Sequence, residues 1–441
     1  MTVPEPKRRR SAHLVTYGCQ MNDADSNDIR EMLLTQGFDI VATESEADLI
    51  ILNTCTIRRK AEDTVFHRLD HVKGFKRINP GLVVGVVGCM GASSRDELEQ
   101  RTPYVDFILP PHQVDAIRDI VQMRFPGDLD GETGADLDPS ETPYRGLVNI
   151  SRGCNNNCTF CIVPSVRGRE TCFSPEEIER QVRRLVEGGA LEITFLGQNV
   201  NSYRSGEVDF ADLVSAICPR FPQIGFRFTS PHPKDFSNKF ILAMARVENL
   251  LRQVHLPMQS GSDRVLRLMK RSYNMKRFYS RVDRLRQHMP GIALGTDVIC
   301  GFPGETEDDF EQTLEAVRRI RFDSAYMFFY SPRPGTEAVN LPGHLPEELR
   351  KDRLNRLISV QLEISREKNL ELVGQVHRGL VERPARRPPG YLQARLDCNR
   401  LVIFPGSENL LGSQLDFEIT SASQVALFGR PRSVEGAAAP S

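Results

Sequence analysis

The chain has 441 residues, of which 40% are hydrophobic and 26% are charged, and its formal net charge is -1. This length exceeds one ordinary core, so we expect a globular protein of two or three domains. The near-zero charge excludes a global attraction to nucleic acid or membrane. No apolar run approaches a bilayer span and the first ten residues lack a signal-peptide core, so we expect a cytoplasmic protein without membrane contact.

Residues 11–126 alternate short apolar runs with stretches whose apolar residues recur at helical spacing. The runs HLVTYG, ADLIILNT and LVVGVVG have the length and the Val, Ile and Leu content of strands. The stretches 23–37 and 58–69, which separate them, have the periodicity of helices. This alternation predicts an open parallel sheet with covering helices, a fold that gathers ligands at the carboxyl ends of its strands.

Each of these three predicted strands ends at a cysteine, namely Cys19, Cys55 and Cys89. If the strands are parallel neighbours, the three thiols lie at one edge of the sheet. A single cysteine at such a position is usually a packing residue, and three buried structural thiols remain an alternative interpretation. Three equivalent positions favour a functional site.

A second block follows an acidic segment rich in Gly and Pro at 126–143, which we interpret as a linker. Within this block, the stretch 174–189 predicts a helix with a capping box formed by Ser174 and Glu177 and a proline at its first position. The expected strands of this block are 146–151, 191–199, 224–230, 253–258, 292–304 and 324–331.

Strands and helices alternate in this second block over about 200 residues, counted from its predicted elements. Such a repeat predicts a partial (β/α) barrel similar to a TIM barrel, at about residues 140–370. The active site of such a barrel lies at the carboxyl ends of its strands.

The tail at 372–436 follows a long helical stretch at 346–372 and changes character. LVGQVHRGLVE, YLQARLDCN, RLVIFPG and QLDFEIT are typical of short antiparallel strands, which predicts a small all-β barrel. From Val373 to Ser433, eight arginines stand against five acidic residues. That balance is compatible with RNA binding, and an ordinary solvated surface is an equally good interpretation.

A cysteine triplet, Cys154, Cys158 and Cys161, directly follows the first strand of the second block in SRGCNNNCTFCIVPSVRG. Ten cysteines are too few for a disulfide scaffold, and a disulfide within the triplet leaves one odd thiol. Structural zinc needs a fourth ligand and usually shows paired CxxC elements. Three thiolates within eight residues favour an iron–sulfur cluster with one iron open to another ligand.

The motif CNNNCTFC matches the CxxxCxxC signature of radical S-adenosylmethionine enzymes, and the chain resembles that superfamily. The resemblance implies a [4Fe-4S] cluster on Cys154, Cys158 and Cys161, with S-adenosylmethionine on the open iron. In that superfamily, one electron from the cluster cleaves the cofactor to methionine and a deoxyadenosyl radical. Phe160 occupies the position where the superfamily often places an aromatic ring near the cofactor's adenine.

The resemblance extends across nearly the whole chain and follows the domain order of methylthiotransferases. It implies a cysteine domain at 11–126, a radical S-adenosylmethionine core at 140–370 and a TRAM domain at 372–436. The motifs that carry it are YGCQMNDADS, NTCTIRRKAED, VVGCM, LGQNVNSY, HLPMQSGSDRVLRLMKR, GFPGETEDDF and SPRPGT.

By this likeness, Cys19, Cys55 and Cys89 hold a second [4Fe-4S] cluster, whose open iron carries the sulfur to be inserted. Catalytic residues beyond the cluster ligands are not implied. Gln198 and Asn199 follow a predicted barrel strand, and Gln259 and Ser260 lie in HLPMQSG, so these four are candidate contacts to S-adenosylmethionine. Turn formation at strand ends is an equally good account of them.

The stretches YGCQMN and NTCTIRRKAEDTVFHRL resemble the MiaB branch of the family. That branch attaches a methylthio group to N6-dimethylallyl(isopentenyl)adenosine at position 37 of tRNA, next to the anticodon. The resemblance therefore implies a tRNA substrate, an electron donor such as a flavodoxin or ferredoxin, and a sulfur source. Two alternatives stay open: a RimO-like ribosomal protein methylthiotransferase, and a zinc-stabilised RNA-binding protein without redox chemistry.

Overall fold

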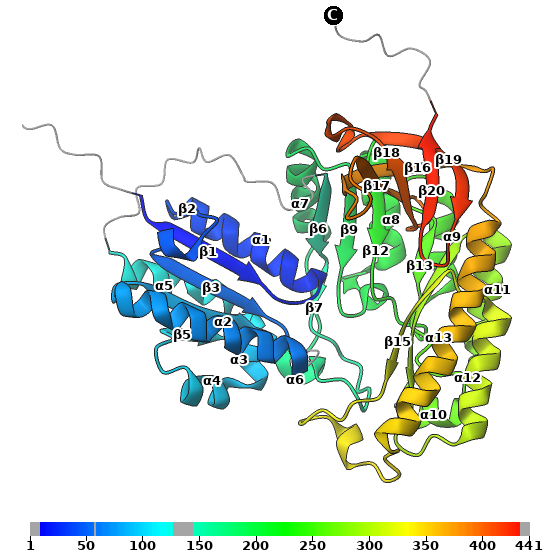
Figure 1. The fold of residues 1–441 in the computed structure, drawn as a ribbon, viewed down its shortest axis with the longest axis horizontal. Coiled ribbons are helices and arrows are strands. Elements are labelled where there is room, and N and C mark those ends of the chain that lie inside the picture. Colours follow the sequence, from blue (N-terminus) through cyan, green and yellow to red (C-terminus); the bar gives the residue numbers. More distant parts are fainter. Residues whose placement is uncertain (1–8, 57–58, 127–143, 433–441) are drawn as a thin grey trace, which may run out of the picture. The chain divides into compact units, whose positions relative to one another are not determined.

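The computed structural model of the chain describes residues 9–56, 59–126 and 144–432 (Figure 1). By the contacts between their residues, these parts form two compact units. The amino-terminal unit includes residues 152–156 and 162–171 in addition to the start of the chain. The predicted linker, apart from its first residue, lies outside the described residues.

The amino-terminal unit is built on a five-stranded sheet in the order β2-β1-β3-β4-β5, in which every neighbouring pair is parallel. This confirms the predicted open parallel sheet. The strands are β1 (Ser11–Thr16), β2 (Asp39–Ile40), β3 (Leu49–Thr54), β4 (Val83–Gly88) and β5 (Phe107–Leu109). The helices are α1 (Gln20–Thr35), α2 (Arg59–Ile78), α3 (Cys89–Ser93), α4 (Arg95–Arg101) and α5 (Ile117–Arg124).

Both faces of this sheet are covered by helices, as the apolar runs of its strands require. Side chains alternate along β3, so Leu49 and Ile51 pack with α1 and α5, while Ile50 and Leu52 pack with α2 and α4 (Figure 1). The four strand residues are fully buried. The sheet is thus the middle layer of three, and its carboxyl edge is where the connections to α1, α2 and α3 leave.

The carboxyl-terminal unit contains two parallel three-stranded sheets, ordered β12-β9-β6 and β13-β14-β15. One isolated parallel bridge, Phe226 to Leu250, connects β12 to the residues just before β13. The strands are β6 (Arg145–Asn149), β9 (Glu192–Leu196), β12 (Gly225–Phe228), β13 (Gln253–His255), β14 (Ala293–Cys300) and β15 (Ser324–Phe329). All six lie within or next to the predicted strand ranges.

The helices that cover these sheets share one continuous core with the strands. The predicted start of α7 is confirmed: the Ser174 side chain accepts a hydrogen bond from the Glu177 amide, and the Glu177 carboxylate accepts one from the Ser174 amide. The helices are α7 (Pro175–Glu187), α8 (Phe210–Ile217), α9 (Asn238–Arg246), α10 (Asp263–Leu268), α11 (Met275–His288), α12 (Glu307–Ile320) and α13 (Glu347–Leu370).

The tail forms a closed five-stranded barrel in the order β16-β17-β18-β20-β19. A small barrel was expected from four antiparallel strands, but the structure adds a fifth strand, β20, which pairs in parallel with β18. This parallel pair closes the barrel. The strands are β16 (Val376–Pro384), β17 (Tyr391–Leu396), β18 (Leu401–Pro405), β19 (Gln414–Ala422) and β20 (Leu427–Pro431).

Buried charges attach the small barrel to the amino ends of the parallel strands. Arg145 and Glu192 begin β6 and β9, and Arg145 Nη1 lies 3.1 Å from Glu382 Oε1 in β16. Arg227 bonds Glu192 and donates to the Leu396 carbonyl at 3.0 Å. Because the barrel is attached at the amino ends, it lies away from the carboxyl ends where the cysteine triplet follows β6.

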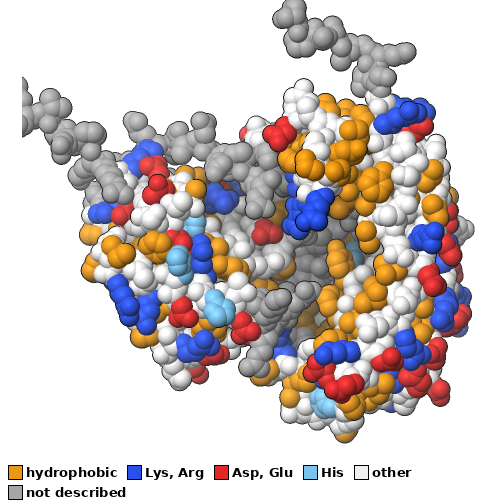
Figure 2. All heavy atoms as spheres, viewed as in Figure 1, with side chains coloured by type: hydrophobic (Ala, Val, Ile, Leu, Met, Phe, Trp, Pro, Cys, Tyr) orange, Lys and Arg blue, Asp and Glu red, His pale blue; other side chains and the backbone are white. Residues whose placement is uncertain are grey.

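Acidic and basic side chains are interspersed over α12 and α13 in Figure 2, in keeping with the near-zero net charge. Ion pairs join these helices, including Arg353 with Glu307 at 3.0 Å and Arg356 with Glu311. Within the described ranges, no helix combines the length and the apolar composition needed to cross a bilayer.

The capping box of α7 gives a stability prediction. Replacing Ser174 with Ala removes the acceptor for the Glu177 amide and should lower the free energy of unfolding by about 1 kcal/mol. Urea titration followed by circular dichroism measures this change. Ser359→Ala is the matched control, because Ser359 is an exposed helical serine within α13, and its effect should stay within about 0.5 kcal/mol. Equal effects of the two substitutions would contradict the assigned cap.

Candidate functional site

Three cysteines follow three adjacent strands of the amino-terminal sheet. The strands β1, β3 and β4 are parallel neighbours, and Thr54 at the end of β3 is paired with Gly88 at the end of β4. Cys55 and Cys89 directly follow this pair, and Cys19 follows β1 after a two-residue connection. Because these strands are parallel neighbours, as the prediction from the sequence assumed, all three residues lie at one edge of the sheet. Cys55 and Cys89 are buried, and Cys19 is half-buried.

Two glycines give this edge its close packing. Gly88 has φ of +96°, and a Cβ atom there would lie 2.4 Å from the Thr54 carbonyl oxygen. A Cβ on Gly18 would lie 2.8 Å from the side chain of Asn22. Asn22 occupies that space and donates from Nδ2 to the Thr54 carbonyl at 2.9 Å. This hydrogen bond from the Asn22 side chain connects the start of α1 to the end of β3.

A buried arginine, Arg167, lies at the same edge on helix α6 (Val163–Arg167). Its guanidinium forms a 3.0 Å ion pair with Asp25 and donates a hydrogen bond to Asn22 Oδ1 at 3.1 Å. Burial alone would lower the pKa of Arg167, but Asp25, Cys89 and Cys19 outweigh it and hold that pKa above its usual range. Burial raises the pKa of the Cys89 thiol, and Arg167 opposes that rise. Nothing in the sequence around Arg167 had singled it out.

The cysteine triplet occupies the loop between β6 and α6. Gly153 opens it with φ of +80°, where a Cβ would lie 2.2 Å from the Arg169 carbonyl oxygen. In the amino-terminal unit, the Cys154 amide donates to the Gly168 carbonyl at 3.1 Å. In the carboxyl-terminal unit, the Cys161 amide donates to the Cys158 carbonyl at 3.0 Å. All three thiols are half-buried.

A second buried arginine contacts this loop. Arg271 Nη1 donates to the Cys158 sulfur at 3.2 Å. Burial alone would lower the pKa of Arg271, but Tyr273 and Cys158 hold it above its usual range. Arg271 was not among the residues predicted from the sequence, because it stands 113 positions after Cys158 and no local pattern connects them.

Several buried polar atoms at the carboxyl ends of the parallel strands have no hydrogen-bond partner in the described structure. Such atoms cost folding free energy, and a polar ligand would offset that cost. They follow or end the strands β6, β9, β13 and β15, which is the end of a parallel sheet where ligands bind. They are Asn149 Oδ1, Ser151 Oγ, Gln198 Oε1, Gln259 Oε1 and Tyr330 OH.

The four polar residues proposed as cofactor contacts divide into two kinds. Gln198 and Gln259 each carry one of the buried unpaired oxygens, and Gln259 has φ of +64°, which is unusual for a side-chain-bearing residue. Asn199 instead donates to Asp235 Oδ2 at 2.7 Å, and the Ser260 hydroxyl lies 3.3 Å from the Thr313 hydroxyl. The two glutamines therefore fit a ligand-binding role better than Asn199 and Ser260, which hold loops in place.

The aromatic residue of the triplet, Phe160, is half-buried in a small apolar cluster. Its ring lies edge-on to Phe302 with 6.3 Å between ring centroids. Phe302 and Tyr330 in turn pack at 5.1 Å, so the ring belongs to the same strand-end region as the unpaired Tyr330 hydroxyl. The role of Phe160 beside an adenine ring stays a prediction.

In the described ranges, no three Cys, His, Asp or Glu side chains converge closely enough to hold a single metal ion. A tetrahedral zinc site requires four donors around one ion, so the described residues do not fit the zinc alternative. In a [4Fe-4S] cluster, each thiolate binds a different iron, and the sulfurs need not converge on one point. The two sets of three cysteines fit that donor chemistry.

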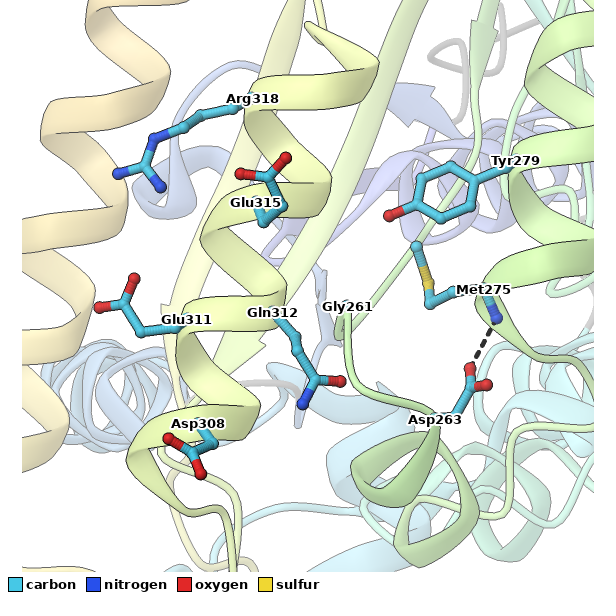
Figure 3. A pocket seen from close by; sticks show the side chains of 9 residues that line it. All are labelled: Gly261, Asp263, Met275, Tyr279, Asp308, Glu311, Gln312, Glu315 and Arg318. Carbon is cyan, nitrogen blue, oxygen red and sulfur yellow. Dashed lines mark hydrogen bonds between the residues drawn. The ribbon is translucent and has the colours of Figure 1, made fainter.

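A surface depression of the carboxyl-terminal unit lies between α11, α12 and the loop before α10 (Figure 3). Its lining includes the acidic residues Asp308, Glu311 and Glu315 of α12 together with Arg318, and Asp263 accepts a hydrogen bond from the Met275 amide at 2.7 Å. Carboxylates repel the phosphates of RNA, so the depression is a poor site for an RNA backbone.

The unpaired oxygen of Gln259 leads to a prediction about the stability of the chain and its affinity for S-adenosylmethionine. Gln259→Leu removes a buried acceptor without a partner, so the chain free of cofactor should keep or gain stability in urea titrations. If the oxygen receives a hydrogen bond from S-adenosylmethionine, the dissociation constant should rise about tenfold. Equilibrium binding of S-adenosylmethionine measures it. An unchanged dissociation constant would show that Gln259 does not contact the cofactor.

Two protein-family models match this chain. Residues 11–110 match the family described as Uncharacterized protein family UPF0004, and residues 148–317 match the Radical SAM superfamily. The solved TsrM methyltransferase of Kitasatospora setae has a TM-score of 0.58 at 13% identity, covering 75% of this chain and 77% of that chain. The radical enzyme OxsB has a TM-score of 0.54 at 15% identity, covering 80% of this chain and 56% of that chain. These two likenesses show the fold alone.

Full-length relatives are much more similar in sequence. The tRNA-2-methylthio-N(6)-dimethylallyladenosine synthase of Moorella thermoacetica is 42% identical over 438 residues, covering 96% of this chain and 98% of that protein. A protein of the same name from Porphyromonas gingivalis is 39% identical over 443 residues, covering 96% of each. The chain therefore belongs to the radical S-adenosylmethionine methylthiotransferases, in the family of the tRNA-2-methylthio-N(6)-dimethylallyladenosine synthases.

Proposed function

We propose that the chain converts N6-dimethylallyl(isopentenyl)adenosine at position 37 of tRNA to its 2-methylthio derivative. The observation that carries this proposal is the meeting of three cysteines at one sheet edge, in a chain that carries a separate cysteine triplet in its radical core. Relatives that are 38–42% identical over nearly their whole length have names that state this reaction. The RimO-like alternative has no such support among these relatives.

Membership of the superfamily implies a [4Fe-4S] cluster and S-adenosylmethionine. We assign this cluster to Cys154, Cys158 and Cys161. A second [4Fe-4S] cluster, which the family likeness implies, would be held by the edge set Cys19, Cys55 and Cys89. Both assignments rest on thiolate donors and on the fit of three ligands with one open iron.

The substrate explains why radical chemistry is needed. Carbon 2 of adenine carries an unactivated C–H bond, which general bases and ordinary nucleophiles do not open. When bound, the first cluster and S-adenosylmethionine supply a carbon radical able to attack such a position. In this proposal Gln198 and Gln259 hydrogen bond the cofactor, Phe160 lies beside its adenine, and Arg271 keeps the Cys158 sulfur in place.

Further parts of the proposal concern architecture and partners. The two three-stranded parallel sheets would form the partial TIM-like barrel of the radical core at 140–370, after a cysteine domain at 11–126. The closed five-stranded barrel would be a TRAM domain at 372–436 that contributes to tRNA binding. Partners would be tRNA, an electron donor such as a flavodoxin or ferredoxin, and a sulfur source, all in the cytoplasm.

The two cysteine sets should be separable by substitution. Cys19→Ala removes one ligand of the edge set, so cleavage of S-adenosylmethionine should continue while methylthio insertion stops. Nucleoside mass analysis of tRNA from a deletion strain carrying the variant measures insertion, and chromatography of deoxyadenosine measures cleavage. Cys398→Ala, at a cysteine outside both sets, is the control and should retain methylthio insertion.

Two results of this experiment would contradict the proposal. Loss of cofactor cleavage in Cys19→Ala would mean that the two cysteine sets have been assigned the wrong way round. Persistence of the methylthio group on prenylated adenosine in the deletion strain, together with its loss from a ribosomal protein, would make the ribosomal protein the substrate.

A further inference from the structure

Arg167 is a charged residue at a buried position. Its side chain is 4% exposed, and the guanidinium remains charged at that depth. Burying a cation costs several kcal/mol unless opposite charges and hydrogen bonds compensate for it. Arg167 stands six residues after Cys161 in sequence, yet it belongs to the amino-terminal unit together with the edge set of cysteines.

The contacts of Arg167 place its charge at the edge of the sheet. Nη2 contacts Asp25 Oδ2 at 3.0 Å and donates to Asn22 Oδ1 at 3.1 Å, and the positive charge favours the thiolate form of Cys89. The same Asn22 oxygen lies 3.5 Å from the Cys19 sulfur. The cation therefore acts on one proposed cluster ligand and is one residue away from another.

Apolar packing keeps the guanidinium in this position. Helices α3 and α6 are in contact (Figure 1), and Ile162 and Val166 pack against Cys89 and Ala92. Asp25 lies at the start of α1, and it also contacts Arg152 at 3.5 Å. Asp25 and Asn22 thus hold the arginine at the edge of the sheet, on a helix that packs against Cys89.

We propose that Arg167 is a positioning residue of the cluster on Cys19, Cys55 and Cys89, and that its buried charge at the edge of the sheet raises the reduction potential of that cluster. The proposal rests on the proposed function, since it requires a cluster at the sheet edge. Reduction adds one negative charge to a cluster. A nearby cation stabilises the reduced form, so the potential rises.

Substitution of Asp25 should change the reduction potential of the cluster in the opposite direction to substitution of Arg167. Its carboxylate lies next to Arg167 and partly neutralises it, so removing that charge should favour the reduced cluster. Arg167→Gln should therefore lower the midpoint potential, and Asp25→Asn should raise it. A merely structural role of the pair does not produce opposite shifts, because both substitutions break the same ion pair.

The experiment uses the full chain with Cys154, Cys158 and Cys161 replaced by Ala, so that only the edge cluster can assemble. After anaerobic reconstitution with iron and sulfide, a redox titration followed by electron paramagnetic resonance gives the midpoint potential. Arg167→Gln, Arg167→Lys and Asp25→Asn are compared in this background. Arg271→Gln is the matched control: it removes a buried arginine that contacts the other cysteine set, and it should leave the potential unchanged.

Opposite shifts in Arg167→Gln and Asp25→Asn, with a smaller downward shift in Arg167→Lys, support the proposal. Unchanged potentials, or shifts of the same sign, overturn it. If Arg167→Gln does not retain iron, the midpoint potentials of the other two variants decide. A lower potential in Arg167→Lys than in Asp25→Asn supports the proposal, and the reverse order overturns it. If the parent triple variant itself binds no cluster while its circular dichroism is native, the proposed function fails rather than the role of Arg167.

Discussion

Parallel pairing of β1, β3 and β4 is the constraint that brings Cys19, Cys55 and Cys89 to one edge of the sheet. Parallel strands point in one direction, so residues that follow them meet at one edge even though Cys19 and Cys89 are 70 positions apart. The sheet can hold this arrangement because both of its faces are buried under helices. Gly88 allows the ends of β3 and β4 to approach closely at this edge. Asn22 connects α1 to the end of β3 by its hydrogen bond to the Thr54 carbonyl.

The parallel strands of the carboxyl-terminal unit differ in the polar groups at their two ends. At the amino ends, Arg145, Glu192 and Arg227 connect the parallel sheet to the small barrel through buried ion pairs. At the carboxyl ends, the unpaired oxygens of Gln198 and Gln259 leave hydrogen-bonding capacity unused. In the proposed function, ligand binding and attachment of the small barrel therefore occupy opposite ends of one set of strands.

Local pattern predicted the parts of the structure that depend on nearby residues. The capping box of α7 and the strands β1, β3 and β4 were correctly predicted, because apolar periodicity and caps act within a few positions. The short strands β2 and β5 were not predicted. The roles of Arg167 and Arg271 were not predicted, since each acts on a cysteine far away in sequence. The strand β20 was missed because the short segment VALFGRP ends in Gly, Arg and Pro, and parallel pairing with β18 alone closes the barrel.

The central claim is that the chain holds two separate [4Fe-4S] clusters, each on three cysteines. Iron and sulfide analysis after anaerobic reconstitution tests it most directly. The account predicts about eight irons per chain for the unchanged sequence, and about four when either set of three cysteines is replaced by Ala. One triple variant replaces Cys19, Cys55 and Cys89 with Ala, and the other replaces Cys154, Cys158 and Cys161 with Ala. Zinc without iron, or a full iron content in either variant, would contradict the account.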